Sequence, residues 1–291
     1  MTYFAWTRRS RHAGAREWTL ALACLSALLA GGASAQVSEA PPDNTPAENP
    51  FALPPLPADA PKPAKDPRNF EGAWIHLDPP VRVYRTDAGE PLPYRPDSKA
   101  ILAHRQELEA HGTPVANPSA LCRPPGITWD FELNFPFVVL QEAAETVFVF
   151  EEFHSVWRIF MEENPRPGPV SPTYGGHSSG HWEGDNLVVR TAGLRADSWL
   201  DIGGSPHSSA AVFEHRIRKI DDGNVLEVKL TVDDPVLYTR PWSITRRMTW
   251  RPDRKVLSEF DCEESTGSDA EARRFHVYSD DAPAQHGDKP R

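Results

Sequence analysis

The stretch VFEHRIRKIDDGNVLEVKLTV, Val212–Val232, decides the fold class, because two runs of alternating residues flank one turn signal. In the second run, Leu226, Val228, Leu230 and Val232 stand at every other position, which is the period of a half-buried β-strand. The DDG between the runs is typical of a hairpin turn. The stretch therefore predicts two antiparallel strands.

The same period recurs on both sides of this hairpin. FVVLQEA and AETVFVFEEF predict a hairpin that turns near Ala144-Glu145, and Gly184-Asp185 predicts a tight turn in a second hairpin. The segments WSITRRMTW and KVLSEFDCE predict that the meander continues after Val232. Helical spacing appears in Asp97–His111, where Asp97 or Ser98 is available as the N-cap.

Many antiparallel strands with one short helix predict an all-β fold. We expect an antiparallel lipocalin-like β-barrel, because closing a sheet removes its exposed edges. The segment FEGAWIHL, Phe70–Leu77, resembles the GxW first strand of lipocalins. A β-sandwich is the alternative architecture.

The first 35 residues are typical of a secretory signal peptide. A basic region of four arginines precedes the apolar run Leu20–Ala30, which is too short to span a bilayer, and Ala33-Ser34-Ala35 fits a cleavage site. A twin-arginine signal at Arg8-Arg9 and lipidation of Cys24 fit the pattern less well. We therefore expect a signal peptide over 1–35, a Pro-rich disordered linker over 36–68, a barrel domain over 69–279 and a disordered tail over 280–291.

The charge of the chain restricts its partners. The net charge is −10, and the signal peptide contributes four arginines and one glutamate, so cleavage leaves about −13. An acidic surface repels nucleic acid and anionic lipid headgroups. We expect no nucleic-acid partner, no stable membrane insertion after cleavage, and a ligand that is a small apolar or aromatic molecule.

Two cysteines, Cys122 and Cys262, follow the expected cleavage site. In an oxidising compartment two distant cysteines predict a disulfide. Two buried free thiols are the alternative. Export and the disulfide together predict a periplasmic or secreted protein.

Four segments between Leu121 and Trp242 resemble a large group of secreted bacterial proteins, most of which have no assigned activity. They read FEEFHSVWRIF, GGHSSGHWEGDNLVV, GGSPHSSA and DDPVLYTRPW, and their core pattern is GxWEGDxLVV. The resemblance marks Glu151, His154, Arg158, Trp182, Glu183, Asp185, His207, Ser208 and Pro241-Trp242 as typical positions. The chain departs from the group at Ser209 and His215, where the resemblance implies glutamates.

Polar residues on otherwise apolar strand faces are candidates for chemistry, because a buried charge is costly unless it is paired. His215 lies between Phe213 and Ile217, and Arg246 lies between Ile244 and Met248. If these faces line the barrel, a histidine and an arginine project into an apolar cavity, which suits proton transfer and the orientation of a carbonyl or carboxylate. A structural ion pair of Arg246 with Glu214 or Glu152 is the alternative.

His154 and Arg158 share strand parity with Phe148 and Phe160, so they are expected to face the same interior unless a bulge near Glu151-Glu152 shifts them. His207 lies in the glycine-containing loop GGSPHSSA and is free to reach the barrel mouth. We assign catalytic roles to His154, Arg158, His207, His215 and Arg246. At least three of His154, His207, His215 and Arg246 should approach one cavity.

The stretch YGGHSSGHW supplies candidate binding residues. His177 and His181 share parity, but four strand residues separate them by about 13 Å, too far for one metal ion. We assign ligand binding to His177, His181, Trp182 and Trp242, and we expect no metal. Metal binding by His154, His177 and His207 is the alternative.

No nucleophile elbow, phosphate loop, dinucleotide-binding glycine pattern or haem-attachment motif is present in the sequence. The GHSSG segment precedes a hairpin signal and lacks the helix that a nucleophile elbow needs. The prediction is a periplasmic enzyme without a cofactor, an isomerase, lyase or hydratase. A lipocalin-like binding protein without catalysis is the alternative.

Overall fold

The computed structural model describes residues 53–111, 118–163 and 171–262. The expected signal peptide over 1–35, the linker up to residue 52 and the tail over 280–291 lie outside the described residues. Within the described ranges, no helix is long and apolar enough to cross a membrane.

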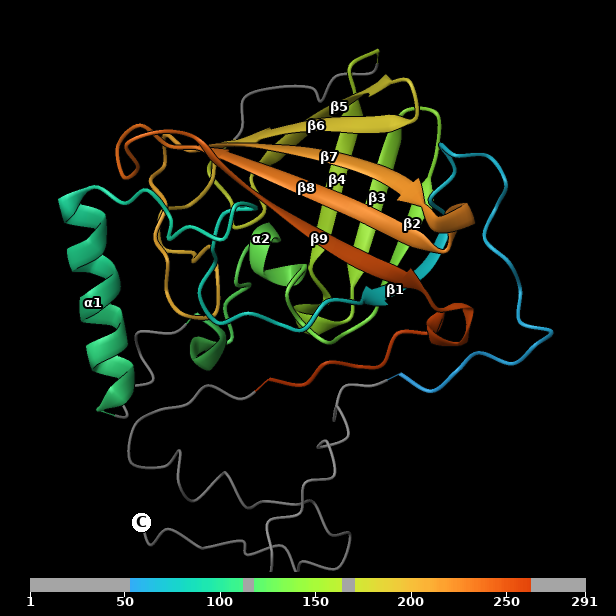
Figure 1. The fold of residues 1–291 in the computed structure, drawn as a ribbon, viewed down its shortest axis with the longest axis horizontal. Helices are drawn as coiled ribbons and strands as arrows, with labels where there is room; N and C mark the ends of the chain where they lie inside the picture. The colour runs from blue at the N-terminus through green and yellow to red at the C-terminus, as the bar shows by residue number, and fades with distance from the viewer. Residues whose placement is uncertain (1–52, 112–117, 164–170, 263–291) are drawn as a thin grey trace, which may run out of the picture. The chain divides into compact units, whose positions relative to one another are not determined.

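Nine strands and two α-helices form in the described residues (Figure 1). The strands are β1 Gly72–His76, β2 Phe137–Gln141, β3 Glu145–Phe150, β4 Val156–Met161, β5 His177–Glu183, β6 Asn186–Ala192, β7 Val212–Ile220, β8 Val225–Asp233 and β9 Trp242–Trp250. The helices are α1 Pro96–Ala110 and α2 Ile127–Asp130. Short 3-10 turns occupy Ser119–Leu121, Glu152–His154, Asp221–Gly223 and Pro252–Arg254.

The strands close into one barrel in the order of the sequence, β1 to β9, and β9 pairs with β1. The closed ring confirms the barrel and excludes the β-sandwich. A ring with an odd number of strands cannot be antiparallel throughout, because each antiparallel neighbour reverses the strand direction. The β4–β5 pair is parallel, and the other eight pairs are antiparallel.

The expected hairpins are confirmed. β7 and β8 pair from Val212↔Asp233 to Ile220↔Val225, and β2 and β3 pair up to Gln141↔Thr146. In the β5–β6 hairpin, Trp182 pairs with Leu187, and Gly184 at the turn has a positive φ of 58°. The turn therefore needs a residue that tolerates this φ, as Gly184-Asp185 predicts.

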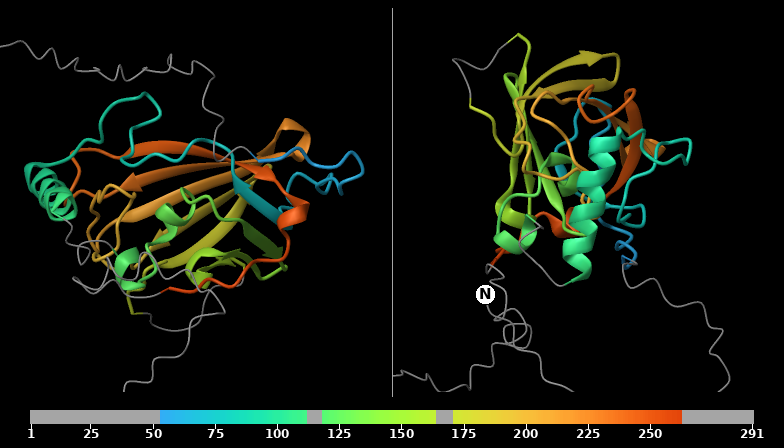
Figure 2. Two further views of the ribbon diagram at one scale, coloured as in Figure 1. Left: turned by 90° about the horizontal axis from the view of Figure 1, so that it is seen from below. Right: turned by 90° about the vertical axis from the view of Figure 1, so that its left-hand side faces the viewer.

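The helix predicted over Asp97–His111 is α1, which lies outside the barrel (Figure 2). The prediction of its N-cap was wrong. The cap is Arg95 without a side-chain hydrogen bond, and Pro96 begins the helix, where its missing N–H costs nothing. The Ser98 hydroxyl donates instead to the Leu237 carbonyl oxygen at 2.6 Å, which ties α1 to the barrel.

The interior of the barrel is packed with side chains. α2 enters the barrel (Figure 1), and its four residues are all buried. The next residue, Phe131, packs its ring edge-to-face against four aromatic rings of the strands: Phe137, Phe148, Phe150 and Trp157. Such pairs stabilise a core beyond the burial of their area. The segment that follows Gly126 therefore fills the lumen that an open binding barrel would leave empty.

The chain after β9 does not continue the meander. KVLSEFDCE was predicted as a strand, but residues 255–262 form none. The physical reason is barrel closure, because the edge of β9 is already occupied by β1. Val256 is 89% exposed, so this segment lies on the surface.

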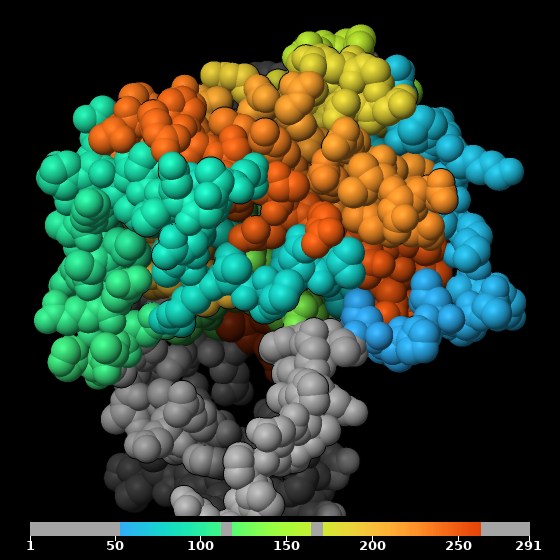
Figure 3. All heavy atoms as spheres, in the orientation of Figure 1, coloured from blue at the N-terminus to red at the C-terminus, as the bar shows by residue number. Residues whose placement is uncertain are grey.

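The folded region begins before Asn69, which corrects the predicted boundary. Residues 53–68 lack strands and helices, as expected, but they lie against the barrel (Figure 3). The carbonyl oxygens of Pro54, Pro61 and Ala64 accept hydrogen bonds from Arg251, Trp250 and Lys219. The last part of the proline-rich segment is thus bound and is not a free tether.

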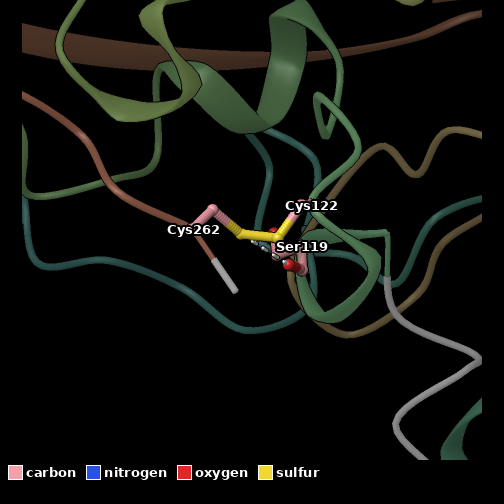
Figure 4. Close-up of a disulfide and its surroundings, with 3 residues drawn as sticks. All are labelled: Ser119, Cys122 and Cys262. Carbon is pink, nitrogen blue, oxygen red and sulfur yellow. Dashed lines mark hydrogen bonds between the residues drawn. A yellow bond between two sulfur atoms is a disulfide. The ribbon is translucent and has the colours of Figure 1, made fainter. Parts of the chain in front are cut away.

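The predicted disulfide between Cys122 and Cys262 is present (Figure 4). Their Cα atoms are 5.7 Å apart, and 140 residues separate them in sequence. The bridge excludes the alternative of two free thiols. It attaches the surface segment after β9 to the loop that precedes α2.

Candidate functional site

His215 faces the barrel interior, as its strand parity predicts. It is fully buried, and its ring centroid lies 4.8 Å from that of Trp157 and 6.2 Å from that of Phe131. Neither ring nitrogen has a hydrogen-bond partner among the described residues. Burial lowers the pKa of His215 to about 3, so the imidazole is neutral at ordinary pH.

Arg246 also faces the interior and forms a buried ion pair. Its Nε–H donates to Glu132 Oε1, and its guanidinium lies 5.2 Å from the centroid of the Tyr84 ring. Glu132 is 0% exposed and also accepts a hydrogen bond from the Val81 backbone N–H at 3.3 Å. The ion pair exists, as the structural alternative proposed, but its partner is Glu132 and neither Glu214 nor Glu152.

The space between these two residues is small. His215 and Arg246 line a cavity of about 10 Å³ together with Tyr84, Thr128, Phe131, Val228, Leu230 and Ile244. This volume corresponds to roughly one water molecule. The interior of the described barrel therefore has no room for a substrate beside His215.

Neither His154 nor His207 lines that cavity, so the expected convergence of at least three of His154, His207, His215 and Arg246 was wrong. Arg158 does not reach it either. The turn before β4 changes the strand parity, because Phe153 and His154 have positive φ values of 53° and 47°. Trp157 points into the barrel as a result, and Arg158 points outward, where it binds Glu145 at 2.7 Å. The shift occurs close to Glu151-Glu152, where a bulge was considered.

His207 is buried in a loop and does not line the cavity beside His215. Its Nε2 lies 2.7 Å from the Ser198 hydroxyl, and its ring packs edge-to-face on Phe213. Burial lowers its pKa. Its surroundings satisfy the imidazole within the loop, away from any described pocket.

The other predicted binding residues are also separated. His181 lies outside the barrel between Glu162 and Glu183, whose carboxylates raise its pKa, with Glu183 the larger influence. Trp182 packs on Phe70, and Trp242 is buried against Tyr238. No three His, Cys, Asp or Glu side chains in the described ranges are grouped to hold a metal ion, so His154, His177 and His207 do not form the site considered.

A further pocket lies where β4 and β5 separate. β4 pairs with β3 along Val156–Phe160 but with β5 only along Ile159–Met161, so the first residues of β4 have a free edge. A pocket of about 470 Å³ opens there. Its wall includes three predicted residues, His154, Arg158 and His177, together with Asp130, Ser155, Tyr174, Phe153 and Phe160.

Gly176 positions His177 at the edge of this pocket. Gly176 has a φ of 67°, and a Cβ there would approach Thr191 Cγ2 to 2.7 Å and the Ala192 carbonyl oxygen to 2.9 Å. The chain can therefore pass β6 this closely only with glycine. The His177 Nε2 then lies 2.6 Å from the Ser171 carbonyl oxygen, which fixes the ring.

Asp130 lines this pocket, and a second buried carboxyl group, Glu152, directly precedes the pocket residue Phe153. Asp130, at the end of α2, is 7% exposed, and Glu152, in the turn before β4, is 8% exposed. Burial raises the pKa of Asp130 well above its usual range, and the charge of Glu152 raises it further. Burial raises the pKa of Glu152 to about 7.

Neither carboxyl group has a cation to neutralise it among the described ion pairs. Asp130 Oδ1 and Glu152 Oε2 have no hydrogen-bond partner in the described chain. Ser155 lies close enough to lower the Asp130 pKa slightly, although it makes no direct hydrogen bond of normal geometry. We call Asp130 and Glu152 the acid pair. Burial favours the protonated form of both carboxyl groups, and the charge of Glu152 adds to this effect on Asp130.

Sequence reasoning missed the acid pair. Asp130 stands in the run ITWDFELNF, between the large apolar residues Trp129 and Phe131. A charged residue in such a run signals burial as clearly as His215 does on its strand. The run has no clear strand or helix period, so the side on which Asp130 lies could not be assigned.

Comparison with known protein families and with curated proteins finds no match to this chain. The resemblance to secreted bacterial proteins with a GxWEGDxLVV core stays a prediction.

Proposed function

We propose that the protein is an exported enzyme without a cofactor that transfers protons on a small apolar or aromatic molecule, as an isomerase, lyase or hydratase does. The observation that carries the proposal is the position of Asp130. Its carboxyl group is buried and lines a pocket large enough for a small ligand, and its Oδ1 has no hydrogen-bond partner in the described chain. A second buried carboxyl group, Glu152, is near enough for its charge to raise the Asp130 pKa. Perturbed carboxyl groups in a pocket are typical of acid–base catalysts.

The acid pair supplies the chemistry in this proposal. Asp130 lines the pocket and is the group that touches the substrate, whereas Glu152 lies behind it and raises its pKa. A protonated Asp130 donates its proton to a substrate oxygen or carbon, and the resulting carboxylate accepts a proton from the substrate or from water. In an isomerisation the two transfers balance, so the pair returns to its first state without an oxidant or a metal.

The pocket walls define the substrate class. Phe153, Phe160 and Tyr174 provide aromatic surface, and Arg158 is neutralised by Glu145 and so supplies little net positive charge. Such walls favour a neutral aromatic or aliphatic molecule over an anion. The acidic surface of the chain acts in the same direction.

The same walls support the alternative, a binding protein without catalysis. A carrier needs the aromatic surface but gains nothing from unpaired carboxyl groups, whose burial destabilises the fold. The acid pair therefore favours the enzyme. A periplasmic or secreted location is part of the proposal, because the disulfide is compatible with a place outside the cytoplasm.

Proton exchange tests the proposed chemistry directly. The protein is incubated in D₂O with small aromatic ketones, unsaturated acids and enols, and deuterium incorporation is followed by proton NMR. We expect exchange or conversion of at least one compound by the wild type and its loss in Asp130→Asn. The exposed-face variant Glu227→Gln is the control and should keep the activity.

Binding without exchange, equal in the wild type and in Asp130→Asn, would support the carrier instead. Exchange that persists in Asp130→Asn would remove the acid pair from the mechanism.

A further inference from the structure

The turn that carries Glu152 is strained. Phe153 and His154 are consecutive residues with positive φ, in a region that side chains other than glycine rarely occupy. Such a backbone conformation is strained and persists only where surrounding contacts hold it. The turn before β4 therefore needs contacts from another part of the chain, and the segment after β9 provides them.

Residues 255–262, which we call the strap, supply these contacts. The Ser258 backbone N–H donates to Glu151 Oε2 at 2.7 Å, and the Phe260 backbone N–H donates to His154 Nε2 at 3.1 Å. The Phe260 ring packs on Phe153 with centroids 4.8 Å apart. The strap thus contacts the residue before Glu152 and the two residues after it.

The strap is also bound to the segment that carries the other carboxyl group. Its last described residue, Cys262, is bridged to Cys122, and Cys262 Sγ lies 3.8 Å from the Ser119 carbonyl oxygen (Figure 4). Between Cys122 and Asp130, the residues Pro124 and Gly126 line the pocket. The strap is therefore attached both to the turn that carries Glu152 and to the loop that precedes Asp130.

We propose that the strap positions the acid pair: Glu151 and His154 accept its backbone N–H groups and thereby hold the turn that buries Glu152. The proposal gives His154 and Glu151 a defined role as positioning residues. It rests on the proposed function only in taking Asp130 as the reacting group. It also makes the pair sensitive to the state of the disulfide, because reduction frees the end of the strap.

Few titratable or charged groups in the described chain lie on the elements around Glu152 and could affect its pKa. Asp130, at the end of α2, is near enough for the charge of Glu152 to raise its pKa. Glu151 and His154 flank Glu152 in the turn, and the strap adds Glu259 and Asp261, which are both exposed. Burial is the cause of the raised pKa of Glu152. A turn that is released from the strap would expose the carboxyl group to water, and its pKa would fall.

The test is the pKa of Glu152, measured in the full chain by NMR titration of ¹³C-labelled carboxyl groups. Ser258→Pro removes the N–H that Glu151 accepts, whereas Ser258→Ala keeps it and is the matched control. We expect the Glu152 pKa to stay near 7 in the wild type and in Ser258→Ala. In Ser258→Pro and in the wild type reduced with dithiothreitol it should fall toward about 4.3, the value of an exposed glutamate.

If Ser258→Pro does not fold, Phe260→Leu decides, because it removes the ring contact with Phe153 and keeps every backbone donor. An unchanged Glu152 pKa in the folded variants and in the reduced protein overturns the strap proposal. Because the titration needs no substrate, a protein that shows the shift but exchanges no deuterium contradicts the proposed function and leaves the strap in place.

Discussion

The buried pair of Arg246 and Glu132 shows what an arginine on an apolar strand face does in this barrel. Arg246→Ala should lower the free energy of unfolding by about 3–5 kcal/mol, because Glu132, at 0% exposure, would be left without its partner. Arg158→Ala is the matched control, since it breaks an arginine–glutamate pair on the surface and should cost less than about 1 kcal/mol. Urea denaturation measures both. Equal losses would show that the buried pair is not structural.

The neutral His215 predicts a specific pH dependence of stability. The pKa of His215 is about 3 in the folded protein and about 6.5 in the unfolded chain. Between these pH values the imidazole is protonated in the unfolded chain and neutral in the folded protein. The contribution of His215 to the free energy of unfolding should therefore decrease as the pH falls from about 6.5 to about 3. The slope is about 1.4 kcal/mol per pH unit for one proton.

His215→Leu should remove that share of the slope, so the quantity to compare is the difference between the two proteins at each pH. The acid pair, whose pKa values are raised by burial, contributes a slope of opposite sign in both proteins. Denaturation at a series of pH values measures this difference. His76, whose pKa burial lowers to about 4, contributes in the same direction and is unchanged in the variant. An identical acid slope in both proteins would mean that His215 is accessible to protons in the folded state.

Single residues also show how far sequence reasoning reaches. His215 and Arg246 were placed correctly, because their strands alternate without interruption across β7 and β9. Arg158 was predicted to face the interior, which was wrong, because the positive φ values of Phe153 and His154 reverse the strand parity. Neither residue is glycine, which adopts positive φ readily, so the sequence does not indicate the reversal. Aromatic residues and histidine are unusual at such angles, so the pattern of the segment reads as a continuous strand.

At the scale of elements, the β4–β5 junction is the feature that creates the pocket. Gly176→Ala should disturb it, because the added Cβ would meet Thr191 and the Ala192 backbone while φ stays at 67°. We expect a loss of about 1–3 kcal/mol in unfolding free energy and weaker binding of any pocket ligand. Gly175→Ala is the matched control, because a Cβ there meets nothing within 4 Å. Similar melting temperatures for the two variants would contradict the proposed role of Gly176.

The parallel β4–β5 pair itself could not be predicted. Both strands alternate as antiparallel strands do, and the side chains of a strand do not encode the direction of its neighbour. Only the odd number of strands requires one parallel pair, and the chain between Met161 and His177 is long enough for the crossover that such a pair needs. The pocket depends on this parallel pair, so the location of the pocket was not predictable. Three residues of the pocket wall, His154, Arg158 and His177, were nevertheless predicted as site residues.

At the scale of the molecule, closure of the barrel explains both why the fold class was predicted correctly and why the last strand was not. Periodicity indicated a closed barrel correctly, but it could not show that α2 and Phe131 fill the lumen, because a short buried helix has no period of its own. The same closure displaced the predicted last strand to the surface, where it became the strap. The candidate site was predicted in the barrel interior, but the pocket lies at the junction of β4 and β5.

The disulfide is a covalent link between residues 140 apart in sequence, and its effect on stability can be separated from its effect on the pocket. Cross-linking residues 140 apart restricts the unfolded chain, for which the chain-entropy model gives about 5 kcal/mol. The double variant Cys122→Ala/Cys262→Ala should lose most of this, measured by denaturation at constant pH. The wild type reduced with dithiothreitol is the control and should match the variant. A loss below about 1 kcal/mol would mean that the unfolded chain is already compact around the bridge.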